Sequence, residues 1–378
     1  MHRRTLLLAL AGWPAFAHAQ SDVHSGAAFG AQTPAPSPAG PAAPSALHFP
    51  ADYGAHPDTR TEWWYMTGSL RADARLWGFQ VTFFRVATGI TAAHASRFAA
   101  TQLVLAHAAL SDLEQRRLRH DQRIARSGFD IAYARGGDTD LALRDWRLKR
   151  VPLPGDTQRS RYTTQVASES AGFGVELQLD TTQPVLLQGA GGVSQKGPGT
   201  AQTSRYYSEP QIAVQGTLTL DGRPIAVQGR AWLDHEWSDA FIPPQAVGWD
   251  WIGMNLDDGS ALTAFRLRRA DGTSLYAGGS WRRAGERTRN FRPAEVRFMP
   301  LRVWQSVATR ALYPVQWRVE TPAGAYAVNA LLDDQELDSR ASTGAVYWEG
   351  ISELRDAAGR SVGRGYLEMT GYAAALQL

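Results

Sequence analysis

The sequence predicts an antiparallel all-β protein with few helices. Apolar residues recur at every second position in segments such as 175–179 and 225–237, which is the period of a strand with one buried face. Turn signals such as Asp221-Gly222 and Asp271-Gly272 separate these segments, and such dipeptides supply the positive-φ positions that tight hairpins need. Helical periodicity is scarce, so we expect only short helical connections at residues 292–304 and 334–340.

The length of the chain predicts more than one β-barrel. Roughly 330 residues follow the N-terminal region, which is more than one small barrel normally holds. We therefore expect an N-terminal domain at residues 51–230 and a C-terminal domain at residues 231–378. Residues 187–210 are rich in Gly, Ser and Gln and lack periodicity. We expect this segment to lie over or between the two domains, because long loops in compact proteins are usually lids or crossings.

The first 19 residues have the pattern of an export signal peptide. Arg3-Arg4 precede an apolar run at residues 6–16, and Ala17-His18-Ala19 offers a small-residue cleavage site. The paired arginines leave the twin-arginine route and the ordinary secretory route open. Residues 20–50 are rich in Ala, Pro, Ser and Gly, which predicts a flexible linker. The mature protein is therefore expected in the periplasm or outside the cell.

The composition excludes several classes of protein. The chain has no cysteine, which excludes disulfides, thiol catalysis and a lipid-anchored N-terminus. Its net charge of +3 includes Arg3 and Arg4, so the mature chain is nearly neutral, and no basic segment interleaved with aromatics suggests a nucleic-acid partner. After the signal, no apolar run is long enough to predict a transmembrane segment.

Three short stretches place ionisable side chains among tryptophans, at residues 61–65, 233–237 and 248–251. A carboxylate or imidazole surrounded by indole rings is poorly solvated, so its neutral form is favoured and its pKa shifts. Such groups are either costly structural hydrogen-bonding groups or tuned acids beside an apolar ligand. No G-x-S-x-G or P-loop motif is present, and Asp239 stands where an H-E-x-x-H zinc motif needs its second histidine.

The second stretch contains the candidate catalytic residue His235. Along an expected strand at residues 231–237, His235 shares one face with Trp237, whereas Asp234 and Glu236 share the other. His235 is a candidate proton donor or acceptor, because histidine titrates near neutrality. A core histidine hydrogen-bonded to a partner explains the residue equally well. The two acids are expected to face solvent or to pair with arginine.

Asp250 is the second candidate catalytic residue. It shares a strand face with Ile252 and Met254, whereas Trp249 and Trp251 lie on the other face. An acid on an apolar face must be hydrogen-bonded, paired or protonated. A protonated Asp250 would deliver a proton to a ligand in a site poor in water. The alternative is a salt bridge to one of the many arginines.

The first stretch supplies candidate ligand contacts. Glu62 and Trp64 share one strand face, Tyr65 lies on the other, and His56 stands just upstream at the expected mouth of a pocket. Aromatic residues at strand spacing more often form a core than a binding cage, so a structural role is favoured for this stretch. The histidines and acids of the chain show no metal-ligand spacing, and no metal or cofactor is predicted.

Eight blocks of the sequence, in order along both halves, carry a family pattern. Over residues 50–372 they resemble the carotenoid 1,2-hydratase (hydroxyneurosporene synthase) family, which includes the secreted AttH-like proteins. The blocks are residues 56–65, 78–85, 106–110, 233–237, 248–251, 256–259, 347–350 and 365–372.

The resemblance implies two lipocalin-like β-barrels and a reaction in which water adds across a terminal C=C of an acyclic carotenoid. Protonating an alkene needs an acid held away from water, and a protonated Asp250 or His235 would serve. Glu236 or His235 would position the attacking water. The resulting carbocation needs nearby π faces. Trp237, Trp249 or Trp251 would supply these π faces.

The resemblance also leaves a non-enzymatic function open. Many exported members of the family look like companions of lipoprotein-handling or lipid-handling transporters. The chain is therefore either a barrel protein that binds and hydrates a long apolar ligand, an isoprenoid or a lipid, or a lipid carrier or accessory protein of an envelope ABC transport system. A carrier needs an apolar lining but no ionisable residue aimed into it, so the positions of His235 and Asp250 discriminate between the two.

Overall fold

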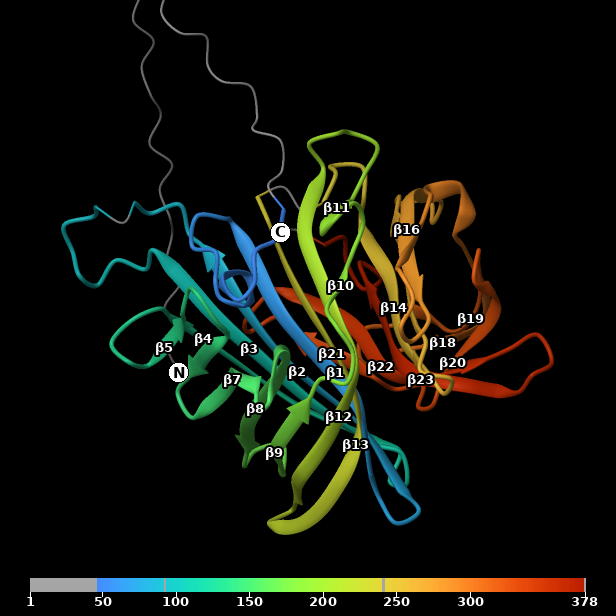
Figure 1. Cartoon of the computed structure of the whole chain (residues 1–378), viewed down its shortest axis with the longest axis horizontal. Coiled ribbons are helices and arrows are strands. Elements are labelled where there is room, and N and C mark those ends of the chain that lie inside the picture. Colours follow the sequence, from blue (N-terminus) through green and yellow to red (C-terminus); the bar gives the residue numbers. More distant parts are fainter. Residues whose placement is uncertain (1–45, 92, 240–241, 377–378) are drawn as a thin grey trace, which may run out of the picture. The chain divides into compact units, whose positions relative to one another are not determined.

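The computed structural model describes residues 46–91, 93–239 and 242–376, and these residues form two antiparallel β-sheets within one compact unit (Figure 1). The expected export signal and residues 20–45 of the expected linker lie outside the described residues. In the described part of the chain, no helix is long and apolar enough to cross a membrane.

Sheet A has 13 strands and is nearly closed into a barrel. Its main path runs in the order β4-β3-β2-β1-β13-β12-β9-β8-β7-β6-β5, and strands β3 and β4 at one end approach β5 and β6 at the other. The strands are β1 (Thr61–Ala72), β2 (Arg75–Ala87), β3 (Gln102–Asp112), β4 (Arg117–Arg126), β5 (Ala132–Ala134), β6 (Asp140–Leu143), β7 (Trp146–Leu153), β8 (Asp156–Ser168), β9 (Phe173–Asp180), β10 (Leu186–Leu187), β11 (Val193–Gln195), β12 (Thr203–Leu220) and β13 (Arg223–Ser238).

Sheet B has ten strands, with a main path in the order β17-β16-β15-β14-β23-β22-β20-β19-β18 and with β21 paired to β22. Its strands are β14 (Gly248–Leu256), β15 (Ala261–Arg268), β16 (Ser274–Arg282), β17 (Arg289–Phe291), β18 (Arg297–Gln305), β19 (Leu312–Thr321), β20 (Gly324–Ala330), β21 (Glu336–Ser339), β22 (Ala345–Arg355) and β23 (Ser361–Thr370). The expected all-β fold of two antiparallel barrel-like units is therefore confirmed.

Strand alternation explains why each sheet has its own core and why the two sheets meet. Even-numbered residues of β1 such as Trp64 and Met66 point into the core of sheet A, whereas Tyr65 points to the other face. Odd-numbered residues of β22 and even-numbered residues of β23 likewise turn away from the core of sheet B. The two outward faces share an apolar group, here called the interface cluster. Its buried members are Tyr65, Leu186, Trp232, Ala246, Trp251, Ala261, Phe265, Leu267, Ile351 and Tyr366.

Two expectations about element boundaries differ from the structure. The helical turns are the 3-10 helices η1 (Ala51–Tyr53) and η2 (Pro293–Glu295), and the rest of the segments 292–304 and 334–340 is mostly strand. The expected domain boundary at residue 230 falls inside β13, which pairs with β1 as far as Ser238. Sheet B begins at Gly248, so the two sheets divide between these residues.

Candidate functional site

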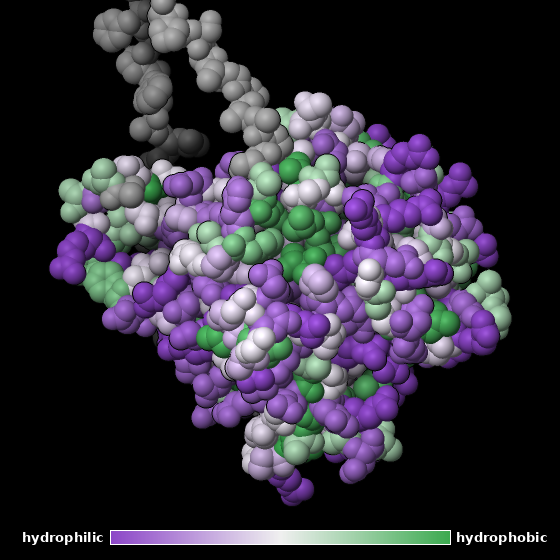
Figure 2. Space-filling model, in the orientation of Figure 1, coloured by the Kyte–Doolittle hydropathy of each residue, from purple (hydrophilic) through white to green (hydrophobic). Residues whose placement is uncertain are grey.

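A cavity of about 350 Å³ lies between the two sheets and is here called the interface cavity. This volume falls within the range of roughly 300–1,000 Å³ that is typical of small-molecule sites. On the face shown in Figure 2, apolar side chains gather where the sheets meet, and polar side chains surround them. The walls of the cavity are rich in aromatic rings. These belong to Trp63, Tyr65, Phe84, Tyr206, Trp249, Trp251, Phe265 and Tyr347.

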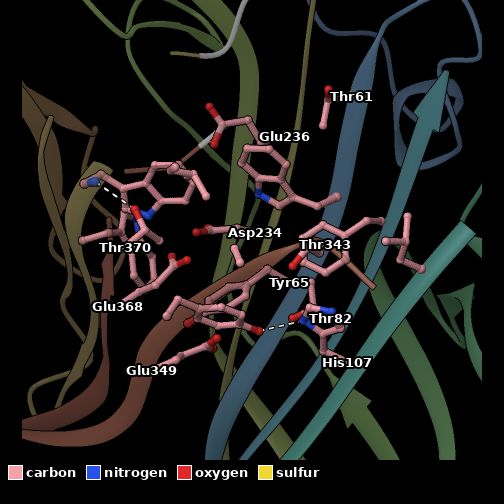
Figure 3. Close-up of a pocket in the computed structure, with 18 of the residues that line it drawn as sticks. Thr61, Tyr65, Thr82, His107, Asp234, Glu236, Thr343, Glu349, Glu368 and Thr370 are labelled. Carbon is pink, nitrogen blue, oxygen red and sulfur yellow. Dashed lines mark hydrogen bonds between the residues drawn. The ribbon is translucent and has the colours of Figure 1, made fainter. Parts of the chain in front are cut away.

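Four carboxyl groups face this cavity, two from each sheet (Figure 3). Asp234 and Glu236 extend from β13 of sheet A, and Glu349 and Glu368 extend from β22 and β23 of sheet B. Period-two alternation puts each pair on the outward face of its sheet. The expectation that Asp234 and Glu236 face solvent or pair with arginine is therefore wrong, because this face is covered by the other sheet.

Asp234 is buried and accepts three hydrogen bonds from neutral donors. The Ser208 hydroxyl and the Trp232 indole N–H donate to its Oδ1 at 2.5 and 2.6 Å, and the Tyr206 hydroxyl donates to its Oδ2 at 2.6 Å. Burial raises the pKa of Asp234 to about 7, although these hydrogen bonds favour the anion. No cation bonds to this carboxyl in the described chain, so the acid titrates near neutral pH.

Glu349 and Glu368 are cross-strand neighbours in the β22–β23 pair. Burial, followed by the charge of Glu368, raises the pKa of Glu349 well above its usual range. Burial also raises the pKa of Glu368 to about 7. Two carboxylates this close repel each other in a poorly solvated site, so the pair holds a proton at neutral pH and titrates as a unit. The Oε1 atom of Glu349 is buried and accepts no hydrogen bond in the described residues, which leaves it available to a ligand.

Glu236 forms the only buried lysine–carboxylate pair among the described residues. The Lys196 ammonium lies 2.8 Å from Glu236 Oε1, and the Ser204 hydroxyl donates to the same carboxylate. The ammonium also lies 4.6 Å from the ring centre of Tyr206 and 4.5 Å from that of Phe265, which are cation–π distances. The aperiodic segment 187–210 thus supplies a cation to the cavity, where it pairs with Glu236.

His107 of β3 and Tyr347 of β22 form a polar contact between the two sheets at the wall of the cavity. Nδ1 of His107 lies 2.7 Å from the Tyr347 hydroxyl (Figure 3). Nε2 of His107 lies 2.8 Å from the Ser342 hydroxyl. Burial lowers the pKa of His107 to about 3, so the imidazole is neutral. Sequence reasoning did not select His107 as a site residue, although it lies within one of the family blocks.

His235 does not face the interface cavity but points into the barrel of sheet A. Its Nε2 lies 2.9 Å from Glu62 Oε1, and its Nδ1 lies 3.1 Å from the Tyr207 hydroxyl. Burial lowers the pKa of His235 against the effect of Glu62, so the neutral imidazole donates from Nε2 and accepts at Nδ1. The expectation of a hydrogen-bonded core histidine agrees with this geometry.

Glu62 is the centre of a buried ionic cluster around His235. Its Oε2 accepts from Arg85 Nε at 2.7 Å, and its Oε1 accepts from His56 Nδ1 at 2.7 Å. Burial opposes the anion, but the bonds from His235 and His56 prevail and hold the pKa of Glu62 well below its usual range. Burial also opposes the charge on His56, but its bonds to Glu62 and Asp52 raise its pKa.

Two further predicted site residues, Trp64 and Trp237, pack around the same ionic cluster. The Trp64 ring stacks on His235 with centroids 4.4 Å apart, and the Trp237 ring stacks on His56 at 3.8 Å. Trp64, Trp237, Glu62, His56 and His235 therefore belong together, inside the barrel of sheet A and away from the interface cavity.

Asp250 points into the core of sheet B. Its Oδ2 lies 2.7 Å from Arg266 Nε and 3.3 Å from Arg268 Nε, and the Tyr372 hydroxyl donates to Oδ1 at 2.8 Å. Two guanidinium groups therefore pair with this carboxylate, which agrees with the expected alternative of a salt bridge to arginine. His235 and Asp250 consequently lie in different barrels, because both strands turn these residues inward.

His56, Glu62 and His235 are also a candidate metal-binding group, since their ligand atoms lie within 4.8 Å of one another. The fully buried Arg85 already pairs with Glu62 at 2.7 Å. A divalent ion there would stand beside a fixed guanidinium charge, and the three residues therefore fit an ion-pair cluster better than a metal centre.

Comparisons with known proteins place this fold in a family. The AttH-like family model matches residues 40–372, and the chain belongs to that family. A crystal structure of a putative AttH from Nitrosomonas europaea is similar at 49% identity and a TM-score of 0.79, covering 87% of this chain and 98% of that one. The expected family membership is confirmed.

A more distant solved structure shares the fold. Kievitone hydratase from Nectria haematococca is similar at 16% identity and a TM-score of 0.65, covering 87% of this chain and 94% of that one. At this identity, the likeness shows the fold alone. A comparison with curated proteins finds no match to this chain.

The structure therefore brings together some predicted site residues and adds others. Glu236, Trp249, Trp251 and Tyr65 line the interface cavity. Glu349 and Glu368 were missed, although Trp348-Glu349 and Tyr366-Leu367-Glu368 show the same signal of acid beside aromatic residues that selected Asp250. The difference lies in which face of the strand meets the other sheet.

Proposed function

We propose that the protein adds water across a C=C bond of a long apolar ligand, an isoprenoid or a lipid, bound in the interface cavity. The observation that carries the proposal is the Glu349–Glu368 pair, whose raised pKa values keep a proton at neutral pH among aromatic rings. A carboxylic acid that stays neutral in an apolar site is suited to protonate a weakly basic substrate.

The proposed reaction proceeds in two steps. The carboxyl proton of the Glu349–Glu368 pair transfers to the less substituted alkene carbon, and the π electrons form the new C–H bond. The cation that develops on the other carbon is stabilised by the faces of Trp249, Trp251 and Tyr65. Water then attacks this carbon and loses a proton to a carboxylate, which restores the acid. The net change is the addition of one water.

Two other polar groups support this chemistry from sheet A. Glu236, which is paired with Lys196, is suited to position the attacking water. Asp234, with a pKa raised to about 7, is suited to exchange protons with the cavity. The proposal gives His235, Asp250 and Trp237 structural roles, because their side chains turn into the barrels.

The first test is to express residues 20–378 in cells that accumulate an acyclic carotenoid and to search by mass spectrometry for a product heavier by one water. Glu349→Gln and Glu368→Gln remove the acid while keeping the shape of the side chain. General acid catalysis contributes about 100-fold or more, so we expect each variant to lose at least this factor in product formation.

Glu176→Gln is the matched control, because Glu176 is exposed on β9. It is expected to retain full turnover. Full turnover in both folded cavity variants would refute the assignment of the acid. Absence of a hydrated product with folded protein would favour a carrier for the same kind of ligand.

The second candidate function is a lipid carrier or an accessory protein of an envelope ABC transport system. An exposed apolar hairpin between β18 and β19 favours a partner of this kind, since Leu301, Val303, Val307 and Leu312 are 51–83% exposed. Under this alternative, the protein binds an apolar ligand unchanged, and Glu349→Gln leaves the affinity intact. Native mass spectrometry of the purified protein and its co-purifying lipid distinguishes the two functions.

A further inference from the structure

A second cavity, of about 600 Å³, lies along the same sheet faces and is here called the arginine cavity. Three arginines and one aspartate supply all the formal charges of its lining: Arg71, Arg230, Arg364 and Asp257. Hydroxyl and amide side chains supply further hydrogen-bonding groups. These are Thr67, Ser69, Gln215, Gln228 and Asn255.

The two cavities follow one another along shared strands. On β23, Glu368 lines the first cavity and Arg364 the second, and on β13 Asp234 and Arg230 do the same. Four residues of strand span about 13 Å, which separates the two charged groups. Between them lie Trp232, Ile351 and Tyr366 of the interface cluster. The space between the sheets is therefore acidic at one end, apolar in the middle and basic at the other end.

The positive charges of the arginine cavity are poorly compensated within the protein. Arg71 and Arg364 make no ion pair in the described part of the chain, and Arg364 Nε is buried without a hydrogen-bond acceptor there. Arg230 lies 3.8 Å from Asp257, and both side chains are exposed, at 44% and 69%. Such an exposed, loose pair neutralises little.

The neighbouring positive charges shift the pKa of Arg364. Burial, followed by the charge of Arg71, lowers the pKa of Arg364, and Arg230 acts in the same direction. Glu353 and Asp257 oppose this effect, but Glu353 is already paired with Arg355 at 2.7 Å. Bringing three guanidinium groups toward one cavity costs free energy, and an anionic ligand would recover it.

We propose that the arginine cavity binds a phosphate monoester dianion. The lining carries a net charge of two positive, which a phosphate monoester dianion neutralises. Guanidinium groups present paired N–H donors that match phosphate oxygens. The amides and hydroxyls of Gln215, Gln228 and Ser69 are suited to the polar group esterified to the phosphate. This site is independent of the proposed hydration chemistry.

The test is isothermal titration calorimetry of residues 20–378 at low ionic strength, where charge-based binding is least screened. The probes are glycerol 3-phosphate, inorganic phosphate and succinate, a dicarboxylate of equal charge. We expect glycerol 3-phosphate to bind most tightly and succinate least. Arg364→Gln and Arg71→Gln are each expected to weaken glycerol 3-phosphate binding at least tenfold.

Arg292→Gln is the matched control, because Arg292 is 82% exposed and does not line the cavity. It is expected to bind glycerol 3-phosphate like the wild type. If Arg364→Gln does not fold, Arg71→Gln tests the same point from an exposed position. The proposal is overturned if glycerol 3-phosphate does not bind, if succinate binds as tightly, or if both arginine variants bind normally.

Discussion

Acidic residues with similar local sequences have different partners in this protein. Asp250 is paired with two arginines, Arg266 and Arg268. Asp234 has only neutral donors, and burial raises its pKa to about 7. Burial, followed by the charge of the neighbouring Glu368, raises the pKa of Glu349 well above its usual range. The partners supplied by neighbouring strands, and not the flanking tryptophans, decide which acid holds a proton.

The protonated Glu349–Glu368 pair predicts a loss of activity at high pH. Burial raises the pKa of Glu368 to about 7, and the neutral form is the proposed acid. The value of kcat/KM for hydration is therefore expected to fall as pH rises from 6 to 9, by up to about tenfold per pH unit above the pKa of the pair. Initial rates across this range, with stability checked at each pH, measure the effect. A rate that rises throughout the range would contradict it.

The buried cluster around Glu62 predicts a large structural effect. Glu62→Gln leaves Arg85 and His56 without their shared anion, and breaking such a buried pair costs about 3–5 kcal/mol. Urea unfolding at pH 7 measures the change in the free energy of unfolding. Glu320→Gln breaks the exposed pair with Arg318 and is expected to cost less than about 1 kcal/mol. Equal effects of the two variants would mean that the cluster contributes no special stability.

At the scale of elements, β1 connects the two environments of the protein. It pairs with β2 on one side and β13 on the other, so Glu62 aligns with Trp237 and Arg85, and Trp64 aligns with His235. Its inward face completes the ionic cluster, whereas its outward face lines the interface cavity through Trp63 and Tyr65. A shift of one residue in register would exchange these two faces.

The close approach of β2 to sheet B predicts that an added methyl group disrupts the interface. A Cβ at Gly78 would lie 2.7 Å from both Ile351 Cβ and the Tyr366 hydroxyl. Overpacking of this kind typically costs about 1–3 kcal/mol, so Gly78→Ala is expected to lower the melting temperature. Gly136→Ala is the control, because its Cβ would meet its nearest atom at 3.5 Å. Scanning calorimetry compares the melting temperatures of the two variants. A melting temperature of Gly78→Ala equal to that of the wild type would show that the sheets move apart at no cost in stability.

At the scale of the whole molecule, several buried acids have raised pKa values. Burial raises the pKa values of Glu209, Asp234 and Glu368 to about 7, and these residues lie in the barrel of sheet A and in the interface cavity. Glu209 accepts hydrogen bonds from Tyr162 at 2.5 Å and from Ser160 at 3.0 Å. Each of these groups binds its proton more tightly in the folded state than in the unfolded state.

This proton uptake predicts that stability falls as pH rises. A raised folded-state pKa contributes stability that is fully present below the unfolded value of 3.8 or 4.5 and is lost as pH passes through about 7. Each group changes the free energy of unfolding by up to about 1.4 kcal/mol per pH unit in this window. Urea unfolding from pH 5 to pH 8 measures the slope, and Glu209→Gln is expected to reduce it. A stability that increases over this range would contradict the assignment.

The sequence by itself determined the fold class, the family and the local strand faces. Period-two alternation correctly put His235 opposite Asp234, and Asp250 opposite Trp249, because side-chain direction along a strand is a local property. The many arginines of the sequence also suggested the alternative that Asp250 forms a salt bridge.

Only the tertiary structure decided which of those faces forms the site. Contacts between residues far apart in the chain set the pairing of β1 with β13 and the packing of sheet B against them. Alternation along one strand contains no information about such contacts. Glu349 and Glu368 became site residues because their face meets the other sheet, whereas His235 and Asp250 were enclosed in separate barrels. A local pattern gives the two faces of a strand, but long-range packing decides which face is covered and by what.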